Sequence, residues 1–311
     1  MNIIPIVFAF DNNLILPACV CISSLLMNAN KDTFYDIFIL HSETELLEKE
    51  EINKLYLFYS NCKITYVLVT NEFEDGYEVR GITKATYYRL LIPQLITQYD
   101  KIIYSDVDVI FRSDLSDLYK IDIENEYVAA TYDLGMILSD TGRKHINKLS
   151  MFEQCKYMQA GFILMNSKKM RMDSLIETFQ KLYRNKYKYQ DQDLLNIVCI
   201  RSHKLLPFKY NMTNYVFYYL NKKHDYFSCF SKEVIDEALE KGTIHYNGQK
   251  PWKGGCINFD IWWEYYRKSP FFDKTYYFDF FDKMLNELDC LTLWKRIKVL
   301  LRYFVYGRYN S

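Results

Sequence analysis

Apolar and polar residues alternate along much of the chain in blocks as long as single strands and helices. Short apolar runs closed by polar residues are typical of buried strands, and they predict strands at 3–10, 35–40, 63–69, 101–104, 107–111, 127–132 and 161–165. Apolar residues at three- and four-residue spacing predict helices at 14–28, 43–59, 85–95 and 173–184. Pro17 fits the first turn of its helix, and the helix at 85–95 should end at Pro93 or soon after.

Strands that alternate with helices predict an α/β fold with a mostly parallel, Rossmann-like central sheet. Ligands of such sheets bind at the carboxyl ends of the strands. Asp11 follows the first predicted strand and Asp106 follows the fourth. The pattern runs without a repeat or a linker, so we predict one catalytic domain over residues 1–270 and a helical tail over 271–311.

Composition narrows the possible partners. The 311 residues include 39 Lys and Arg against 39 Asp and Glu, so no excess of positive charge indicates a nucleic-acid partner. Eight cysteines without a CxxC pair indicate reduced thiols. Residues 1–30 contain no Lys or Arg, and the apolar run at 14–27 is too short to span a bilayer. These features predict a cytoplasmic protein.

The motif with the clearest chemistry is Tyr-Ser-Asp-Val-Asp at 104–108. Asp106 and Asp108 are two residues apart, so in an extended chain they point to the same side. Paired carboxylates suit Mg²⁺ or Mn²⁺, which also bind diphosphates. The alternative is that both are solvated loop residues, or that one caps a helix.

Three further segments carry candidate binding groups. In His-Tyr-Asn-Gly-Gln-Lys-Pro-Trp at 245–252, His245, Gly248 and Lys250 suit a diphosphate site, although a lone histidine is often structural. The run Gln-Asp-Gln-Asp at 190–193 either binds sugar hydroxyls or caps the helix that it opens. Small residues at 160–161 precede a predicted strand and permit close approach of a ligand.

Six motifs together resemble family 8 of the glycosyltransferases, and they occur in that family's order over residues 3–265. They are AFDNN at 9–13, TYYRL at 86–90, YSDVD at 104–108, QAG at 159–161, YQDQD at 189–193 and HYNGQKPW at 245–252. The resemblance implies a GT-A fold and a retaining transfer of glucose or galactose from a UDP-sugar to a glycan acceptor, as in lipopolysaccharide synthesis. It also implies a Mn²⁺ (or Mg²⁺) cofactor.

The resemblance assigns roles residue by residue. It implies metal binding by Asp106, Asp108 and His245. It implies donor contacts, for uracil and ribose, the diphosphate and the sugar, by Ala9, Asp11, Asn13, Arg89, Asp106, Val107, Asp133, Gln159, Ala160, Asp191, Gly248 and Lys250. Gln192 matches the side chain beneath the reacting carbon of the sugar, and Asp191 is the candidate for a covalent route by analogy with retaining glycosidases. Many relatives have Asn where this chain has Gln159, so the contacts to the donor sugar are expected to differ.

Two other classes remain open at this point. A metal-dependent nucleotidyltransferase or phosphohydrolase also uses Asp-x-Asp on a parallel sheet. A non-catalytic sugar-binding relative would keep the fold, but intact Asp106, Asp108, His245 and Lys250 argue against it.

The last 22 residues, 290–311, contain five Lys or Arg and no acidic residue. Apolar residues recur there at helical spacing between the cations, which is the pattern of a helix at a membrane surface. We therefore expect an anionic membrane surface as a partner, with the protein peripheral on the inner face of the cytoplasmic membrane and a lipid-linked glycan as a possible acceptor class. The alternative is a helix that packs on the domain.

Overall fold

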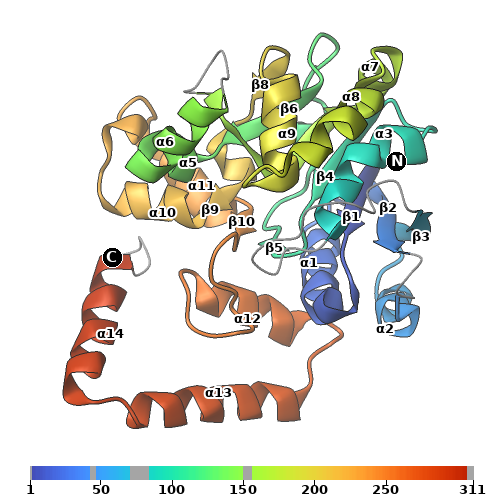
Figure 1. The fold of residues 1–311 in the computed structure, drawn as a ribbon. Helices are drawn as coiled ribbons and strands as arrows, with labels where there is room; N and C mark the ends of the chain where they lie inside the picture. The colour runs from blue at the N-terminus through green and yellow to red at the C-terminus, as the bar shows by residue number, and fades with distance from the viewer. Residues whose placement is uncertain (1, 43–46, 71–83, 150–155, 307–311) are drawn as a thin grey trace.

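The computed structural model of the chain describes residues 2–42, 47–70, 84–149 and 156–306 (Figure 1). A seven-stranded sheet lies at its centre in the order β3-β2-β1-β4-β7-β6-β8. The strands of this sheet are β1 (Asn2–Ala9), β2 (Thr33–Ser42), β3 (Cys62–Val69), β4 (Lys101–Ser105), β6 (Val128–Tyr132), β7 (Met158–Asn166) and β8 (His203–Leu205). The sheet is mostly parallel, as predicted, and β7 alone among these strands runs antiparallel to both neighbours.

Helices cover both faces of the sheet. Successive residues of its strands point to opposite faces, and both faces carry apolar side chains that must be buried. On β1, Ile4, Ile6 and Phe8 pack in a core with α1, while Val7 packs in a second core with α8 and α9. The helices up to this layer are α1 (Ile15–Met27), α2 (Lys49–Asn53), α3 (Ile92–Leu95), α4 (Ser116–Tyr119), α5 (Leu134–Leu138), α6 (Asp140–Lys148), α7 (Ser167–Met172), α8 (Leu175–Leu182) and α9 (Gln190–Cys199).

A second, three-stranded sheet lies beside the first, in the order β5-β10-β9. Its strands are β5 (Val109–Ile110), β9 (Met212–Thr213) and β10 (Ile244–His245). A third, aromatic core joins this sheet to the later helices. These helices are α10 (Asn214–Asn221), α11 (Lys232–Lys241) and α12 (Phe259–Lys268).

The chain ends in an arm of two helices, α13 (Lys274–Asp289) and α14 (Leu293–Tyr306), which leaves the body below α12 and returns toward α10 (Figure 1). The first half of α13 packs on α12, because Phe280 and Phe281 lie with their ring centroids 4.5 and 5.1 Å from that of Trp263. The predicted division at residue 270 stays a prediction. Within the described ranges, the helices all fall short of the length and apolarity needed to cross a bilayer.

Most predicted elements are present, and two differ in kind. Residues 84–91 form a 3₁₀ helix, and only Ile92–Leu95 are α-helical. In a 3₁₀ helix, residues three apart share a side, and Thr86 and Arg89 both face Asp191. In 43–59, α-helix is confined to Lys49–Asn53, with a 3₁₀ turn after it; residues 43–46 lie outside the described part.

Candidate active site

The central sheet has its switch point between β1 and β4. From β1 the chain builds β2 and β3 on one side, and then returns to place β4 on the other side. Val7 pairs with Tyr104, so the two strands end together. Loops that leave such a point in opposite directions open a crevice that binds ligands. Asp106 therefore lies at the edge of the sheet where ligands of such folds bind, as predicted from the sequence.

The start of β7 also lies at this edge. Because β7 runs antiparallel to β4 and β6, it begins beside the carboxyl ends of these two strands. Ser105 pairs with Phe162, and the Asp106 N–H donates to the Gly161 carbonyl at 2.7 Å. Gln159 and Ala160, predicted to precede a strand, lie within it. A side chain at Gly161 would collide with both Asp106 and His245, so glycine leaves the room that this pair needs.

The small sheet brings His245 to the two aspartates. His245 pairs with Val109, the residue after Asp108, and the Tyr246 N–H donates to the Asp108 carbonyl at 2.8 Å. The His245 Nε2 atom lies 3.2 Å from Asp108 Oδ1 and 3.8 Å from Asp106 Oδ2. One ligand atom from each residue lies within 4.8 Å of the others, so the three predicted metal ligands form one cluster.

The donor set of this cluster fits a divalent cation. Asp108 Oδ1 is buried and has no hydrogen-bond partner among the described residues, although it faces His245 Nε2. On the other side of the ring, His245 Nδ1 lies 2.9 Å from Asn211 Oδ1. Two ligand atoms that are each about 2.1 Å from one Mg²⁺-sized ion lie at most about 4.2 Å apart. The 3.2 and 3.8 Å separations meet this limit.

Lys250 contacts the cluster through Asp108. Its Nζ atom contacts Asp108 Oδ2 and donates to the Tyr246 carbonyl at 2.7 Å. Burial by itself raises the pKa of the Asp108 carboxyl, but Lys250 and His245 together more than offset this effect and hold the pKa well below its usual range. Asp108 is therefore an anion at neutral pH.

Arg89 links the cluster to the predicted sugar site. The guanidinium is buried and contacts Asp106 Oδ1 through Nη2 at 2.9 Å and Asp191 Oδ2 through Nε at 2.9 Å. Its Nη1 atom donates to the Ala160 carbonyl at 2.6 Å. Tyr104 also donates to Asp106 Oδ1, at 2.7 Å. These bonds fix the Asp106 carboxylate and leave its Oδ2 atom toward His245.

Asp191 is enclosed in the same network. Its Oδ1 atom accepts from the Thr86 hydroxyl at 2.5 Å, and its other oxygen meets Arg89. Burial raises the pKa of Asp191 to about 6, because desolvation outweighs the attraction of Arg89 and the bond from Thr86. Both oxygens of this carboxylate thus have partners within the protein.

Gln192 is held at both ends of its amide. Its Oε1 atom accepts from the Ala160 N–H at 3.0 Å, and its Nε2 atom donates to Asp133 Oδ2 at 3.0 Å. Asp133 caps α5 by accepting from the Met136 N–H. The start of α9 is therefore fixed to both β7 and α5, so the run at 190–193 both opens a helix and lines the edge of the site.

The remaining predicted donor residues lie at or just after the ends of β1, β4 and β10. Ala9 ends β1, and Asp11 in the loop after it accepts from the Asn13 N–H at 3.0 Å. The side chain of Val107 is buried in the core. Gly248 follows β10, where a side chain would collide with Asn214.

Three residues of the network were missed by sequence reasoning. Tyr104 and Thr86 belong to two of the six motifs but had no assigned role, and the place of Thr86 three residues before Arg89 was the available signal. Asn211 stands in no pattern at all, and only the pairing of β9 with β10 brings it beside His245.

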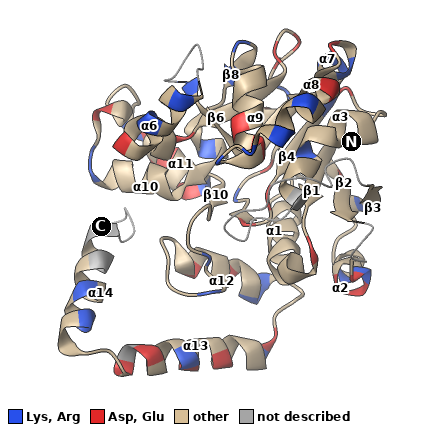
Figure 2. Ribbon diagram, viewed as in Figure 1, with Lys and Arg blue, Asp and Glu red and all other residues tan. Residues whose placement is uncertain are grey.

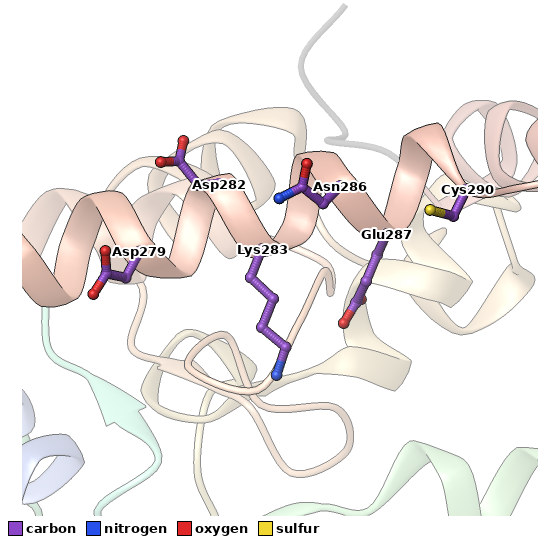
Figure 3. Close-up of a pocket in the computed structure, with 6 residues that line it drawn as sticks. All are labelled: Asp279, Asp282, Lys283, Asn286, Glu287 and Cys290. Atoms are coloured by element: carbon purple, nitrogen blue, oxygen red, sulfur yellow. The ribbon is translucent and has the colours of Figure 1, made fainter.

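A separate hollow of about 550 Å³ runs along the second half of α13 (Figure 3). None of its lining residues belongs to the cluster. They are Asp279, Asp282, Lys283, Asn286, Glu287 and Cys290. The candidate active site is therefore the cluster at the carboxyl ends of β1 and β4, and not this hollow.

Known proteins share this sequence and fold. The family model described as Glycosyl transferase family 8 matches residues 5–256. The lipopolysaccharide 1,2-glucosyltransferase of Escherichia coli is 25% identical over 280 residues, which cover 86% of this chain and 76% of the relative. The lipopolysaccharide 1,3-galactosyltransferase of Salmonella typhimurium strain LT2 is 21% identical over 257 residues, covering 79% and 72%.

Among solved structures, the galactosyltransferase LgtC in complex with donor and acceptor sugar analogues aligns with a TM-score of 0.70 at 23% identity. The alignment covers 88% of this chain and 99% of that one. This likeness confirms the GT-A fold expected from the motifs. With four fifths of its length matched by the family model, the chain belongs to glycosyltransferase family 8.

Proposed function

We propose that the protein is a retaining, Mn²⁺-dependent hexosyltransferase that moves glucose or galactose from a UDP-sugar to a glycan acceptor with an α linkage. The observation that carries this proposal is the cluster of Asp106, Asp108 and His245 at the switch point of the sheet. The names of the lipopolysaccharide glucosyl- and galactosyltransferases among its relatives support the sugar classes and a role in surface polysaccharide or lipopolysaccharide synthesis.

The protein's own groups suit a diphosphate leaving group. A divalent cation held by the cluster would supply Lewis-acid stabilisation of the negative charge that develops on the diphosphate. Lys250 contacts Asp108 in the free protein and is proposed, with the Gly248 backbone, to turn to the diphosphate when the donor binds. Ala9, Asp11 and Asn13, at the neighbouring end of β1, are proposed to hold uracil and ribose, with the Val107 backbone along the ribose.

The buried network beside the cluster is proposed to hold the sugar and to permit front-face attack. Asp191 is a poor candidate for a covalent nucleophile, because Arg89 and Thr86 occupy both of its oxygens. Gln192 has an amide fixed at both ends, which suits a group that lies beneath the reacting carbon without bonding to it. The acceptor hydroxyl would then attack on the face from which the diphosphate departs, through a short-lived oxocarbenium-like state.

A donor screen tests this proposal. The full-length protein is incubated with UDP-glucose or UDP-galactose and an oligosaccharide acceptor, with and without Mn²⁺. We expect Mn²⁺-dependent release of UDP from one donor, stimulated by the acceptor, and an α-linked product by NMR. Release of UMP or inorganic phosphate would indicate a nucleotidyltransferase or a phosphohydrolase. UDP binding without turnover of either donor would favour a non-catalytic relative, and a β-linked product would exclude a retaining mechanism.

We also propose that α14 attaches the protein to an anionic membrane surface, on the inner face of the cytoplasmic membrane, where a lipid-linked glycan acceptor would lie. Most apolar side chains in the described part of α14 are exposed: Leu293, Trp294 and Phe304 are 70%, 76% and 81% exposed. In Figure 2 the ribbon of α14 is coloured for Lys and Arg but not for Asp or Glu in its described part, whereas α13 carries residues of both signs. The attraction to anionic lipid would therefore come from α14, where each cation would contribute about 1 kcal/mol to binding.

Truncation after Asp289 is expected to abolish co-sedimentation with anionic vesicles and to leave UDP binding and the unfolding temperature unchanged, because the aromatic contacts of α13 remain. The matched variant Lys295→Gln/Lys298→Gln should weaken sedimentation in proportion to the lost charge. Arg296 is left intact, since it donates to the carbonyls of Asp289 and Leu291 and joins the two helices. Failure of the full-length protein to sediment with these vesicles at low salt would contradict the proposal.

A further inference from the structure

A chain of buried amides leads from the backbone of β7 to the metal-facing ring. Gly161 N–H lies 2.6 Å from Gln159 Oε1, Asn211 Nδ2 lies 2.9 Å from the same atom, and Asn211 Oδ1 lies 2.9 Å from His245 Nδ1. Gln159, Asn211 and His245 are 6%, 1% and 1% exposed. Water therefore has little access to these bonds, and the protein's own groups decide the orientation of each amide.

The hydrogen bond from the Gly161 N–H fixes the orientation of each side-chain amide along this chain. The Gly161 N–H can only donate, so the Gln159 atom that faces it is the carbonyl oxygen. That oxygen also faces Asn211, so Asn211 must present its NH₂ group there and its own oxygen to His245. An oxygen opposite Nδ1 requires the proton of a neutral imidazole to be on Nδ1, which leaves a lone pair on Nε2.

The Asp108 carboxylate lies on the Nε2 side of the ring. Asp108 Oδ1 lies 3.2 Å from Nε2 and yet has no hydrogen-bond partner among the described residues. With the proton on Nδ1, Nε2 and this oxygen are two acceptor atoms that face each other, an arrangement that suits a shared cation. The amide chain therefore presents His245 in the form in which a metal ligand must be.

We propose that Gln159 and Asn211 are positioning residues that hold His245 in its Nδ1–H tautomer, with Nε2 free for the metal. This inference rests on the metal site of the proposed function, and it gives Gln159 a role other than sugar recognition by its oxygen. Both lone pairs of Oε1 are occupied, by Gly161 and Asn211. A sugar hydroxyl that met Gln159 would find the Nε2 donor only.

The tautomer is directly measurable in the metal-free protein by long-range ¹H–¹⁵N NMR of ¹⁵N-histidine-labelled samples at mildly alkaline pH, with His245→Gln to assign the signals. Wild-type His245 should be protonated on Nδ1. In Gln159→Met, which removes the acceptor at similar volume, Asn211 is free to turn, and a mixture of tautomers is expected. Gln159→Glu keeps an acceptor for both donors and should restore the Nδ1–H form.

Metal binding gives a second readout, measured as the free Mn²⁺ signal in electron paramagnetic resonance. Outer partners of metal-bound histidines typically contribute about 10- to 100-fold in affinity, so the Mn²⁺ Kd should rise by about tenfold or more in Gln159→Met and in Asn211→Leu, and much less in Gln159→Glu. A wild-type His245 protonated on Nε2 would overturn the proposal without any variant, as would a Gln159→Met protein with an unchanged tautomer. If wild type shows the Nδ1–H form but binds no Mn²⁺, the proposed function fails and the positioning role stands.

Discussion

Asp108→Asn is expected to lower the rate of sugar transfer by about 1,000-fold. The substitution keeps the shape of the side chain but removes an anionic ligand that faces both His245 and Lys250. A metal contributes several kcal/mol to the stabilisation of a charged transition state, and about 4 kcal/mol corresponds to this factor. Steady-state UDP release with saturating donor measures the change, and Mn²⁺ titration should show the loss of binding that causes it.

Asp117→Asn is the matched control, since its side chain is 83% exposed on α4 and pairs only with Lys120 among the ion pairs of the described residues. It should behave as wild type. EDTA should abolish wild-type turnover, and added Mn²⁺ should restore it. Full activity in EDTA, or an Asp108→Asn protein with near-normal turnover, would show that the cluster binds no catalytic metal.

Gly161→Ala is expected to lower turnover by about 100-fold or more and to destabilise the fold by about 1–3 kcal/mol. The new Cβ atom would lie closer than 3.0 Å to both Asp106 Oδ2 and His245 Cε1. Neither neighbour can move away at low cost, because Arg89 holds the carboxylate and Asn211 holds the ring. Overpacking of a buried site costs a few kcal/mol, and a displacement of about 1 Å at a reacting centre costs about 100-fold in rate.

Gly255→Ala separates this effect from a general intolerance of Gly→Ala changes. A Cβ atom at Gly255 meets no other atom within 4 Å, so stability and turnover should stay at wild-type levels. Thermal unfolding, Mn²⁺ affinity and UDP release are measured for both variants. A Gly161→Ala protein with wild-type Mn²⁺ affinity would mean that the cluster rearranges freely, contrary to the network described here.

The predicted elements that match the structure are those in which the spacing of apolar residues follows directly from which sides of the strand or helix are buried. The first strand and helix match their predicted ranges to within one or two residues, as β1 and α1 show. The 3₁₀ helix at 84–91 was not predicted, since its form depends on contacts that Thr86 and Arg89 make with Asp191, about a hundred residues away. The spacing of apolar residues along the chain does not indicate contacts with such distant residues.

The candidate site likewise has residues that could be placed from the sequence and residues whose position only the structure explains. Asp106 could be placed from its position after a strand, because the end of a parallel strand is a predictable location for a ligand. That His245 lies beside Asp108 came only from resemblance, and the structure explains it: β5 and β10 pair antiparallel, with Val109 opposite His245. That Gln159 contacts the donor sugar stays a prediction; in the fold its oxygen faces Gly161 and Asn211.

By itself, the sequence determined the alternating fold, the family and the carboxylates at the end of β4, because strand and helix periods and motif order are local properties of the chain. The tertiary structure alone decided how Asn211 orients His245, how Arg89 contacts both Asp106 and Asp191, and that most apolar side chains in the described part of α14 are exposed. Such features depend on pairings between residues far apart in sequence and on which groups lose water. Those pairings exist only after the sheets have formed, so no local pattern can encode them.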